Sequence, residues 1–134
     1  MTHTTREKTK LLNRVRRLRD ALEREARAIA PEAIVIGAGA DRLPNTTCLA
    51  VPGTRAETLV IALDLAGVAV SAGAACSSGK VSASHVLGAM GLSSDVAAAA
   101  VRVSLGATTT ERDLWAFLTA WAEAVGKRRS RAVA

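Results

Sequence analysis

The spacing of apolar and polar positions along the chain predicts one helix near each end and short strands between them. In residues 6–30, apolar side chains recur at three- and four-residue intervals with arginines between them, and Pro31 follows. This spacing is typical of an amphipathic helix that stops before a proline. Short apolar runs bounded by glycine or a Pro-Gly pair predict three strands, at 33–39, 47–53 and 68–73.

A fourth strand is predicted at 101–105, where the sequence VRVSL alternates strictly between apolar and polar residues. Successive side chains of a strand point to opposite faces, so the two valines and the leucine share one face. Arg102 and Ser104 share the other face. The alternation therefore places Arg102 away from the core.

Small polar residues mark where the remaining helices begin. We expect N-caps at Thr54, Ser84, Ser94 and Thr110. Glu57 stands three residues after the first of these caps, as in a capping box, and Asp113 lies in the first turn of the last helix. We expect three of these helices to end at Gly67, Gly91 and Gly126.

Together these elements predict an α+β fold of two layers, with a small, mostly antiparallel sheet and helices packed on one face. At 134 residues, 49% hydrophobic and 22% charged, the chain fits a single domain. We place this domain at residues 1–125, with the helix 6–30 leading into it. Residues 126–134 form a basic tail.

The net charge of +6 is concentrated at the two ends of the chain. Residues 1–30 carry a net +5 and residues 126–134 a net +4, whereas residues 31–125 carry a net −3. Few aromatic side chains are available to stack on bases. This distribution argues against nucleic-acid binding and favours a solvated or partner-facing basic surface.

No 18-residue apolar stretch and no secretory signal pattern occur in the sequence. We therefore expect a cytoplasmic protein with no membrane span. In that compartment both cysteines are expected to be reduced.

Cysteine and histidine supply the candidate reactive groups. Cys76 lies in SAGAACSSGK, residues 71–80, whose small residues favour a mobile loop, and Lys80 is close enough in sequence to favour a thiolate. Composition alone leaves a reactive thiol and an incidental surface cysteine equally open. Cys48 lies within a predicted strand, where a small apolar core thiol is expected, and His85 is expected to be structural. No CxxC or HxxxH spacing joins these residues, so we expect no zinc site.

The stretch GAGADR, residues 37–42, follows a predicted strand and invites comparison with dinucleotide-binding loops. The GxGxxG pattern requires a third glycine where Arg42 stands, and Pro44 follows where a helix would begin. We interpret the stretch as a glycine-rich turn.

The motifs from Asp41 to Leu114 resemble those of a known family. They read DRLPNTTCLAVPG, then ETLVIALDLAGVAVSAGAACSSGK, then SHVLGAMGL, and finally VRVSLGATTTERDL. In order and spacing this stretch resembles the C-terminal small domain of NifS/IscS-type cysteine desulfurases, which belong to the class V aminotransferases of fold type I. The cysteine loop is specific to the long-loop branch of that family.

The resemblance implies a role for two residues. Cys76 matches the nucleophile that takes sulfur from L-cysteine, becomes a persulfide and leaves L-alanine. Arg102 matches the arginine that holds the substrate carboxylate, a task for which a planar bidentate donor is suited. The mobile loop would then carry sulfur to an acceptor or iron-sulfur scaffold protein, for iron-sulfur cluster or thio-cofactor assembly. The complete enzyme is expected to be a homodimer.

Three departures from the family pattern concern the surroundings of these two residues. Ala83 precedes Ser84 where Glu-Pro is common, Ala107 replaces the arginine after Ser-Leu-Gly, and residues 98–100 replace His-Gly-Ser. These changes affect loop anchoring and partner contacts. Cys76 and Arg102 are retained.

The resemblance also implies a pyridoxal phosphate cofactor, held by a large domain through a Schiff-base lysine. The four lysines, Lys8, Lys10, Lys80 and Lys127, are not in the family's His-Lys context. We therefore expect this chain to act as part of a desulfurase only with a separate pyridoxal-binding domain or subunit. The alternative is a non-enzymatic sulfur carrier or protein-interaction module.

Overall fold

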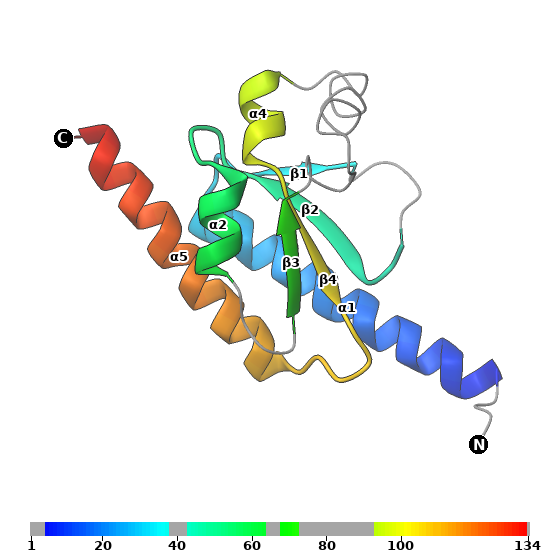
Figure 1. Ribbon diagram of the computed structural model, residues 1–134. Helices are drawn as coiled ribbons and strands as arrows, with labels where there is room; N and C mark the ends of the chain where they lie inside the picture. Colours follow the sequence, from blue (N-terminus) through cyan, green and yellow to red (C-terminus); the bar gives the residue numbers. More distant parts are fainter. Residues whose placement is uncertain (1–4, 38–42, 64–67, 73–92, 134) are drawn as a thin grey trace.

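The computed structural model describes residues 5–37, 43–63, 68–72 and 93–133 (Figure 1). In chain order the described elements are α1 (Thr5–Ile29), β1 (Ile34–Ile36), β2 (Thr46–Ala50), α2 (Ala56–Ala62), β3 (Val68–Ala72), α4 (Ser94–Ala99), β4 (Val101–Leu105) and α5 (Glu111–Val133). The predicted α+β class is confirmed. No helix within the described ranges is both long enough and apolar enough to cross a membrane.

The four strands form one antiparallel sheet in the order β1-β2-β4-β3. Strand β4, the last in sequence, therefore lies between β2 and β3 and pairs with both. All four predicted strands are present, and the bounds of β4 agree with the alternation that predicted it. After β1, Gly37 has φ +74°, a conformation that favours glycine and suits the predicted turn.

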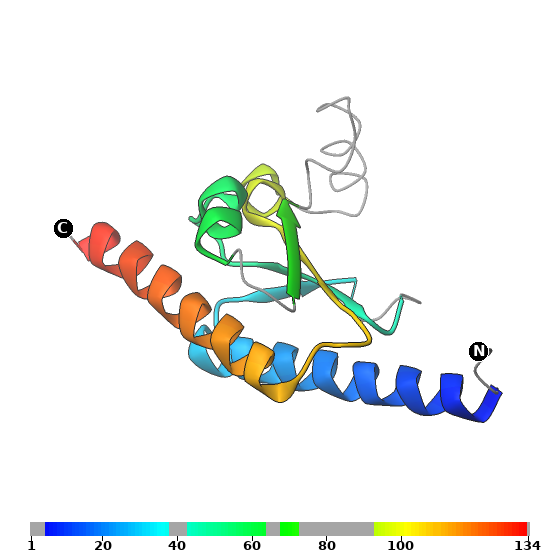
Figure 2. The same ribbon diagram turned by 60° about the horizontal axis from the view of Figure 1, so that its bottom comes forward.

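Helices α1, α2 and α5 cover one face of the sheet and bury the main core. Figure 2 shows α1 and α5 together below the sheet, with the start of α1 and the end of α5 projecting in opposite directions. Phe117 and Trp121 of α5 are fully buried and stack with ring centroids 6.0 Å apart. The Trp121 indole N–H donates to the Ala26 carbonyl of α1 at 3.1 Å, so a hydrogen bond also joins the two helices.

The other sheet face carries a smaller apolar cluster. Ile36 of β1 and Ala50 of β2 pack there with Ala97 and Ala99 of α4 and with Ala100, the C-cap of that helix. This cluster covers only one part of the face. The face that bears Arg102 is thus distinct from the one that α1 and α5 cover.

Two predicted helix starts are wrong. The Thr54 hydroxyl donates to the Val51 carbonyl at 2.7 Å, and α2 begins after Arg55, which makes no side-chain cap. Helix α4 is capped by Ser93, whose oxygen accepts from the Val96 N–H at 3.3 Å, and not by Ser94. Thr54 bonds back to the preceding turn instead of capping, and at α4 the adjacent serine makes the cap; the sequence alone does not distinguish these local arrangements from the predicted ones.

At α5 the predicted start is confirmed and the predicted end is wrong. The predicted cap at Thr110 is present, since its hydroxyl accepts from the Asp113 N–H at 3.3 Å; the Thr110 N–H also donates to the Asp113 carboxylate at 2.9 Å, which makes a reciprocal capping box. The helix does not end at Gly126 but continues to Val133. Lysine and arginine follow this glycine, and they favour helix and suit a helix C-terminus. Helix α2 ends at Ala62, with Leu63 as its C-cap, and not at the predicted Gly67. The predicted boundaries at Ser84 and Gly91 lie outside the described residues.

Candidate functional site

Arg102 lies on the central strand β4 and projects from the sheet face opposite the main core. It is exposed, while Val101 and Val103 on either side of it are fully buried. Its cross-strand partners are Cys48 on β2 and Ser71 on β3. The structure thus places the predicted substrate-binding arginine on an accessible face, held by a strand with neighbours on both sides.

The side chains beside Arg102 are small. Directly opposed residues of an antiparallel pair have Cβ atoms about 4.5–5.5 Å apart, so Cys48 and Ser71 flank the arginine stem. The next residue on this face of β4 is Ser104, which pairs with Thr46 and Ala69. A guanidinium in this setting has room to meet a planar anion with two parallel hydrogen bonds.

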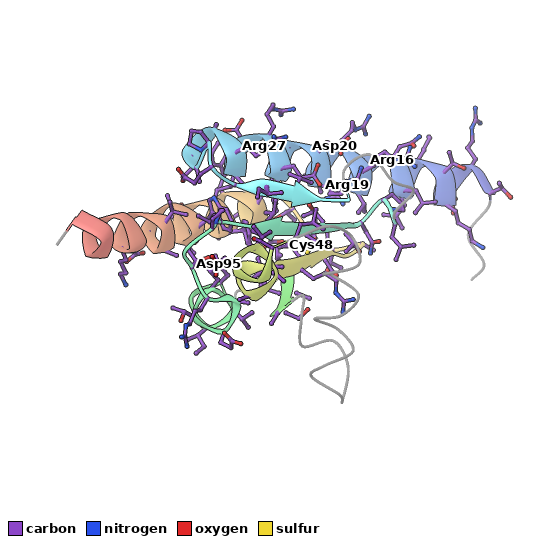
Figure 3. All side chains as sticks on the ribbon, turned by 90° about the horizontal axis from the view of Figure 1, so that it is seen from above. Arg16, Arg19, Asp20, Arg27, Cys48 and Asp95 are labelled. Atoms are coloured by element: carbon purple, nitrogen blue, oxygen red, sulfur yellow. The ribbon has the colours of Figure 1, made fainter. Side chains whose placement is uncertain are left out.

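Cys48 is half-buried and lies on the same sheet face as Arg102. It packs beside the apolar cluster that includes Ile36, with which it pairs across β1 and β2. Figure 3 shows Cys48 on the sheet. The expected apolar packing of this thiol is present, but at the edge of the smaller cluster and not in the main core.

A clamp at the end of β4 fixes the register that orients Arg102. The Leu105 N–H donates to the Asn45 backbone carbonyl at 2.8 Å, and the Asn45 side-chain amide donates to the Leu105 carbonyl at 3.0 Å. These two bonds extend the β2–β4 ladder beyond Thr46. Because a one-residue slip would turn every side chain of β4 to the other face, the clamp holds Arg102 outward.

Helix α1 supports the same region from below. The buried Arg19 donates to the Leu43 carbonyl at 3.1 Å, just before the clamp, and pairs with Asp20 at 2.9 Å (Figure 3). Arg19 and Asn45 were given no role from the sequence. The Leu-Pro-Asn motif was the available signal, because a polar residue immediately before a strand is placed to bond to the neighbouring strand.

The remaining predicted site residues, Cys76, Lys80 and His85, lie outside the described residues. Ser71, the cross-strand partner of Arg102, is the first residue of the segment that contains Cys76. Strand β3 ends at Ala72, one residue after Ser71. Cys76 stands five positions after Ser71, and five residue steps of chain span at most about 18 Å.

Comparison with known proteins assigns the family. The model of the family Aminotransferase class-V matches residues 5–117, most of the chain. The chain belongs to the class-V aminotransferase family. Residues that match this family include α1, the sheet and the first turns of α5.

Individual relatives agree with this class-V assignment. The chain is 46% identical over 100 residues to a cysteine desulfurase of Cereibacter sphaeroides, which covers 75% of this chain and 26% of the relative. It is 40% identical over 100 residues to the cysteine desulfurase NifS of Azotobacter vinelandii, at 75% and 25% coverage. The solved NifS-like protein from Rickettsia africae has a TM-score of 0.71 and 32% identity, and the match covers 86% of this chain and 29% of that one.

The predicted resemblance to NifS-type cysteine desulfurases is therefore confirmed. This chain spans about a quarter of the length of the curated relatives that it matches. The family-level similarity extends over the clamp, Arg102 and the cysteine segment, because all of them fall within residues 5–117.

Class-V aminotransferases generally depend on pyridoxal phosphate. The lysines that the structure describes, Lys8 and Lys10 on α1 and Lys127 on α5, lie on the helix layer, away from the face of Arg102. Lys127 also lies 3.9 Å from Glu123 within its own helix. The described residues of this class-V chain therefore do not fit a Schiff-base site for the cofactor. Within the same ranges, no three His, Cys, Asp or Glu side chains gather as a metal site.

Proposed function

We propose that this chain is the sulfur-accepting part of a cysteine desulfurase. In this proposal Cys76 takes sulfur from L-cysteine and becomes a persulfide, L-alanine is released, and Arg102 holds the substrate carboxylate. A separate domain or polypeptide supplies pyridoxal phosphate and its lysine. The persulfide then serves iron-sulfur cluster or thio-cofactor assembly through an acceptor protein.

The observation that carries the proposal is the position of Arg102. An exposed guanidinium between two small side chains, on a strand held from both sides, suits recognition of a free amino acid through its carboxylate. Its neighbour Ser71 begins the segment that bears Cys76. The proposal thus assigns carboxylate binding to Arg102 on β4, and sulfur transfer to Cys76, five positions after the cross-strand partner of Arg102.

The sulfur transfer balances without an external oxidant. The C–S bond of L-cysteine breaks, an S–S bond forms at Cys76, and the protons of the two reactants are retained in a persulfide and L-alanine. A thiolate is the reactive form of cysteine, and Lys80, four residues further along the chain, would favour it electrostatically. Pyridoxal phosphate would supply the electron sink on the substrate carbon when its own domain is present.

The test is reconstitution with a pyridoxal-binding polypeptide from the same cells. The two chains are co-expressed, purified together and supplied with L-cysteine, and L-alanine is measured over time. We expect release that is lost in Cys76→Ser and retained in Cys48→Ser, the matched control thiol. Equal release in both variants would contradict the assignment of Cys76.

Persulfide on Cys76 in a preparation that contains no pyridoxal phosphate would favour the sulfur-carrier alternative. The observation that favours this alternative is the large core between the sheet and α1, α2 and α5, because a chain with its own core can fold as an independent module. The absorption spectrum of the purified material separates the two cases, because bound pyridoxal phosphate absorbs visible light and this chain alone does not.

A further inference from the structure

A groove runs between α1 and α5 on the helix layer, the layer opposite the face of Arg102. Its volume is about 410 Å³. Apolar side chains from both helices form its floor: Leu18, Ala21, Leu114 and Leu118. None of these residues has a part in the function proposed above, so the groove is a separate feature of the molecule.

The two walls of the groove differ in chemistry. The α1 wall carries three arginines, Arg14, Arg17 and Arg24, whereas the α5 wall carries Trp115. Trp115 is 61% exposed, although tryptophan at a protein surface has a large apolar area to bury. Arginine and tryptophan are the residue types most enriched where binding energy is concentrated in protein interfaces.

The positive charge of the α1 wall extends along the helix. Thr5–Ile29 contains nine Lys or Arg and four Asp or Glu, a net charge of +5. Two acids also line the groove: Glu25 lies 3.8 Å from Arg24, and Glu111 begins α5, where a carboxylate suits the helix N-terminus. The potential along the α1 wall therefore favours acidic ligands.

Two of the arginines differ in how they are held. Arg14, which lines the groove, donates to the Thr109 carbonyl at 2.5 Å and to the Ala107 carbonyl at 3.4 Å, so its guanidinium is held in place. A guanidinium has five N–H donors, so donors remain for a ligand. Arg17, one turn further along α1, is exposed.

We propose that this groove docks an acidic amphipathic helix of a partner protein. The carboxylates of that helix lie along the α1 arginines, and its apolar side chains cover Trp115 and the leucine floor. A helix fits because it can place one apolar face on the floor of the groove and Trp115 while its acidic face meets the α1 arginines. A second copy of this chain does not fit, because it would bring one strongly basic α1 towards another.

Nucleic acid fits the groove less well than an acidic helix. Its floor is apolar, Trp115 is its single aromatic side chain, and Glu25 and Glu111 would repel phosphates. An acidic helix can place apolar residues against the floor and avoid both glutamates by its orientation. The partner is therefore defined by an apolar stripe flanked by Asp or Glu.

The experiment uses the full chain and two synthetic 18-residue peptides labelled with fluorescein. In the first, leucines recur at three- and four-residue spacing with glutamates elsewhere; the second has the same composition in an order that spreads the leucines around the helix. Fluorescence anisotropy measures binding. We expect the patterned peptide to bind at least about tenfold more tightly than the scrambled one.

Two pairs of variants locate the site. Arg17→Glu and Arg16→Glu change the net charge equally at adjacent exposed positions of α1, but only Arg17 lines the groove. We expect about tenfold weaker binding in Arg17→Glu and less than about threefold in Arg16→Glu. Trp115→Ser should weaken binding about tenfold, and Ala116→Ser, an exposed neighbour outside the groove, should leave it unchanged.

Equal binding of the two peptides, or equal losses in Arg16→Glu and Arg17→Glu, would overturn the proposal in favour of diffuse charge attraction. Absence of binding by the patterned peptide would overturn it as well. Displacement of the patterned peptide by a single-stranded oligonucleotide at equal charge concentration would overturn it in favour of a nucleic-acid surface. Circular dichroism confirms that each variant is folded. None of these outcomes depends on Cys76 or on sulfur transfer.

Discussion

Arg102 and Cys48 face each other across the β2–β4 ladder, with both side chains on the sheet face that α1 and α5 leave open. Arg102 is exposed, and Cys48 is half-buried beside the apolar cluster of β1 and α4. A cation and a thiol therefore adjoin at the proposed substrate site. In the proposed function Arg102 binds the substrate carboxylate, whereas sulfur is transferred to Cys76 and not to Cys48.

Substitution of Arg102 should affect substrate binding more than folding. In the reconstituted enzyme, Arg102→Lys should raise KM for L-cysteine about tenfold, because a lysine cannot make two parallel bonds to a carboxylate, and Arg102→Ala should raise it further. Because the side chain is exposed, the free energy of unfolding should change by less than about 0.5 kcal/mol. Steady-state kinetics and urea unfolding measure the two effects. An unchanged KM for L-cysteine in both variants would contradict the assignment of Arg102 to substrate binding.

The Asn45 clamp should be measurable as a stability difference between two substitutions. Asn45→Ala removes the amide that donates to the Leu105 carbonyl and should cost about 1 kcal/mol of unfolding free energy. Asn45→Asp should cost more, because it places a carboxylate oxygen against that carbonyl. Urea unfolding of the purified chain compares them. A smaller loss in Asn45→Asp than in Asn45→Ala would contradict the assigned hydrogen bond.

Thr47 offers a stabilising substitution. Its side chain is 1% exposed on the core face of β2, and its hydroxyl oxygen has no hydrogen-bond partner within the described residues. Thr47→Val keeps the shape and removes a buried polar group, so we expect stabilisation of about 1 kcal/mol. Thr46→Val, on the open face, is the control; it removes a 3.4 Å bond from the Thr46 hydroxyl to the Asn45 side-chain oxygen and should not stabilise the chain. A lower urea midpoint for Thr47→Val would show that the hydroxyl is satisfied.

The two tryptophans should differ in how much stability they lose on the same replacement. Trp121→Phe removes a fully buried indole and its bond to the Ala26 carbonyl, and should cost about 1–3 kcal/mol. The Ala26 carbonyl still accepts a hydrogen bond from the Ala30 N–H at 3.0 Å, so the substitution leaves no buried acceptor without a donor. Trp115→Phe, at the groove, should change stability by less than about 0.5 kcal/mol. Similar losses in the two variants would contradict the described packing of α5.

The orientation of Arg102 could be predicted from the sequence because strand alternation is a local property. The same holds for the capping box of Thr110 and Asp113, whose two partners lie three residues apart. In contrast, the placement of β4 between β2 and β3 depends on pairings between distant segments, which local patterns do not specify. The Asn45 clamp and the α1–α5 groove arise only from those long-range contacts.

Errors in the sequence predictions occurred where two local solutions have similar energies. Thr54 could cap a helix or bond to Val51, and the second arrangement is present. Gly126 could end α5, but its cost of about 1 kcal/mol within a helix is offset by the basic helix formers that follow. The roles of Cys76 and Arg102 came from the family resemblance, because composition alone does not distinguish a catalytic thiol from an incidental one.

The most direct test of the central claim is to locate the transferred sulfur. The reconstituted enzyme is incubated with L-cysteine, digested under conditions that preserve persulfides, and analysed by mass spectrometry of the two cysteine peptides. The account predicts one added sulfur atom on the peptide with Cys76, lost in Arg102→Ala at limiting substrate, and none on the peptide with Cys48. Sulfur on Cys48, or on neither peptide while L-alanine is released, would contradict it.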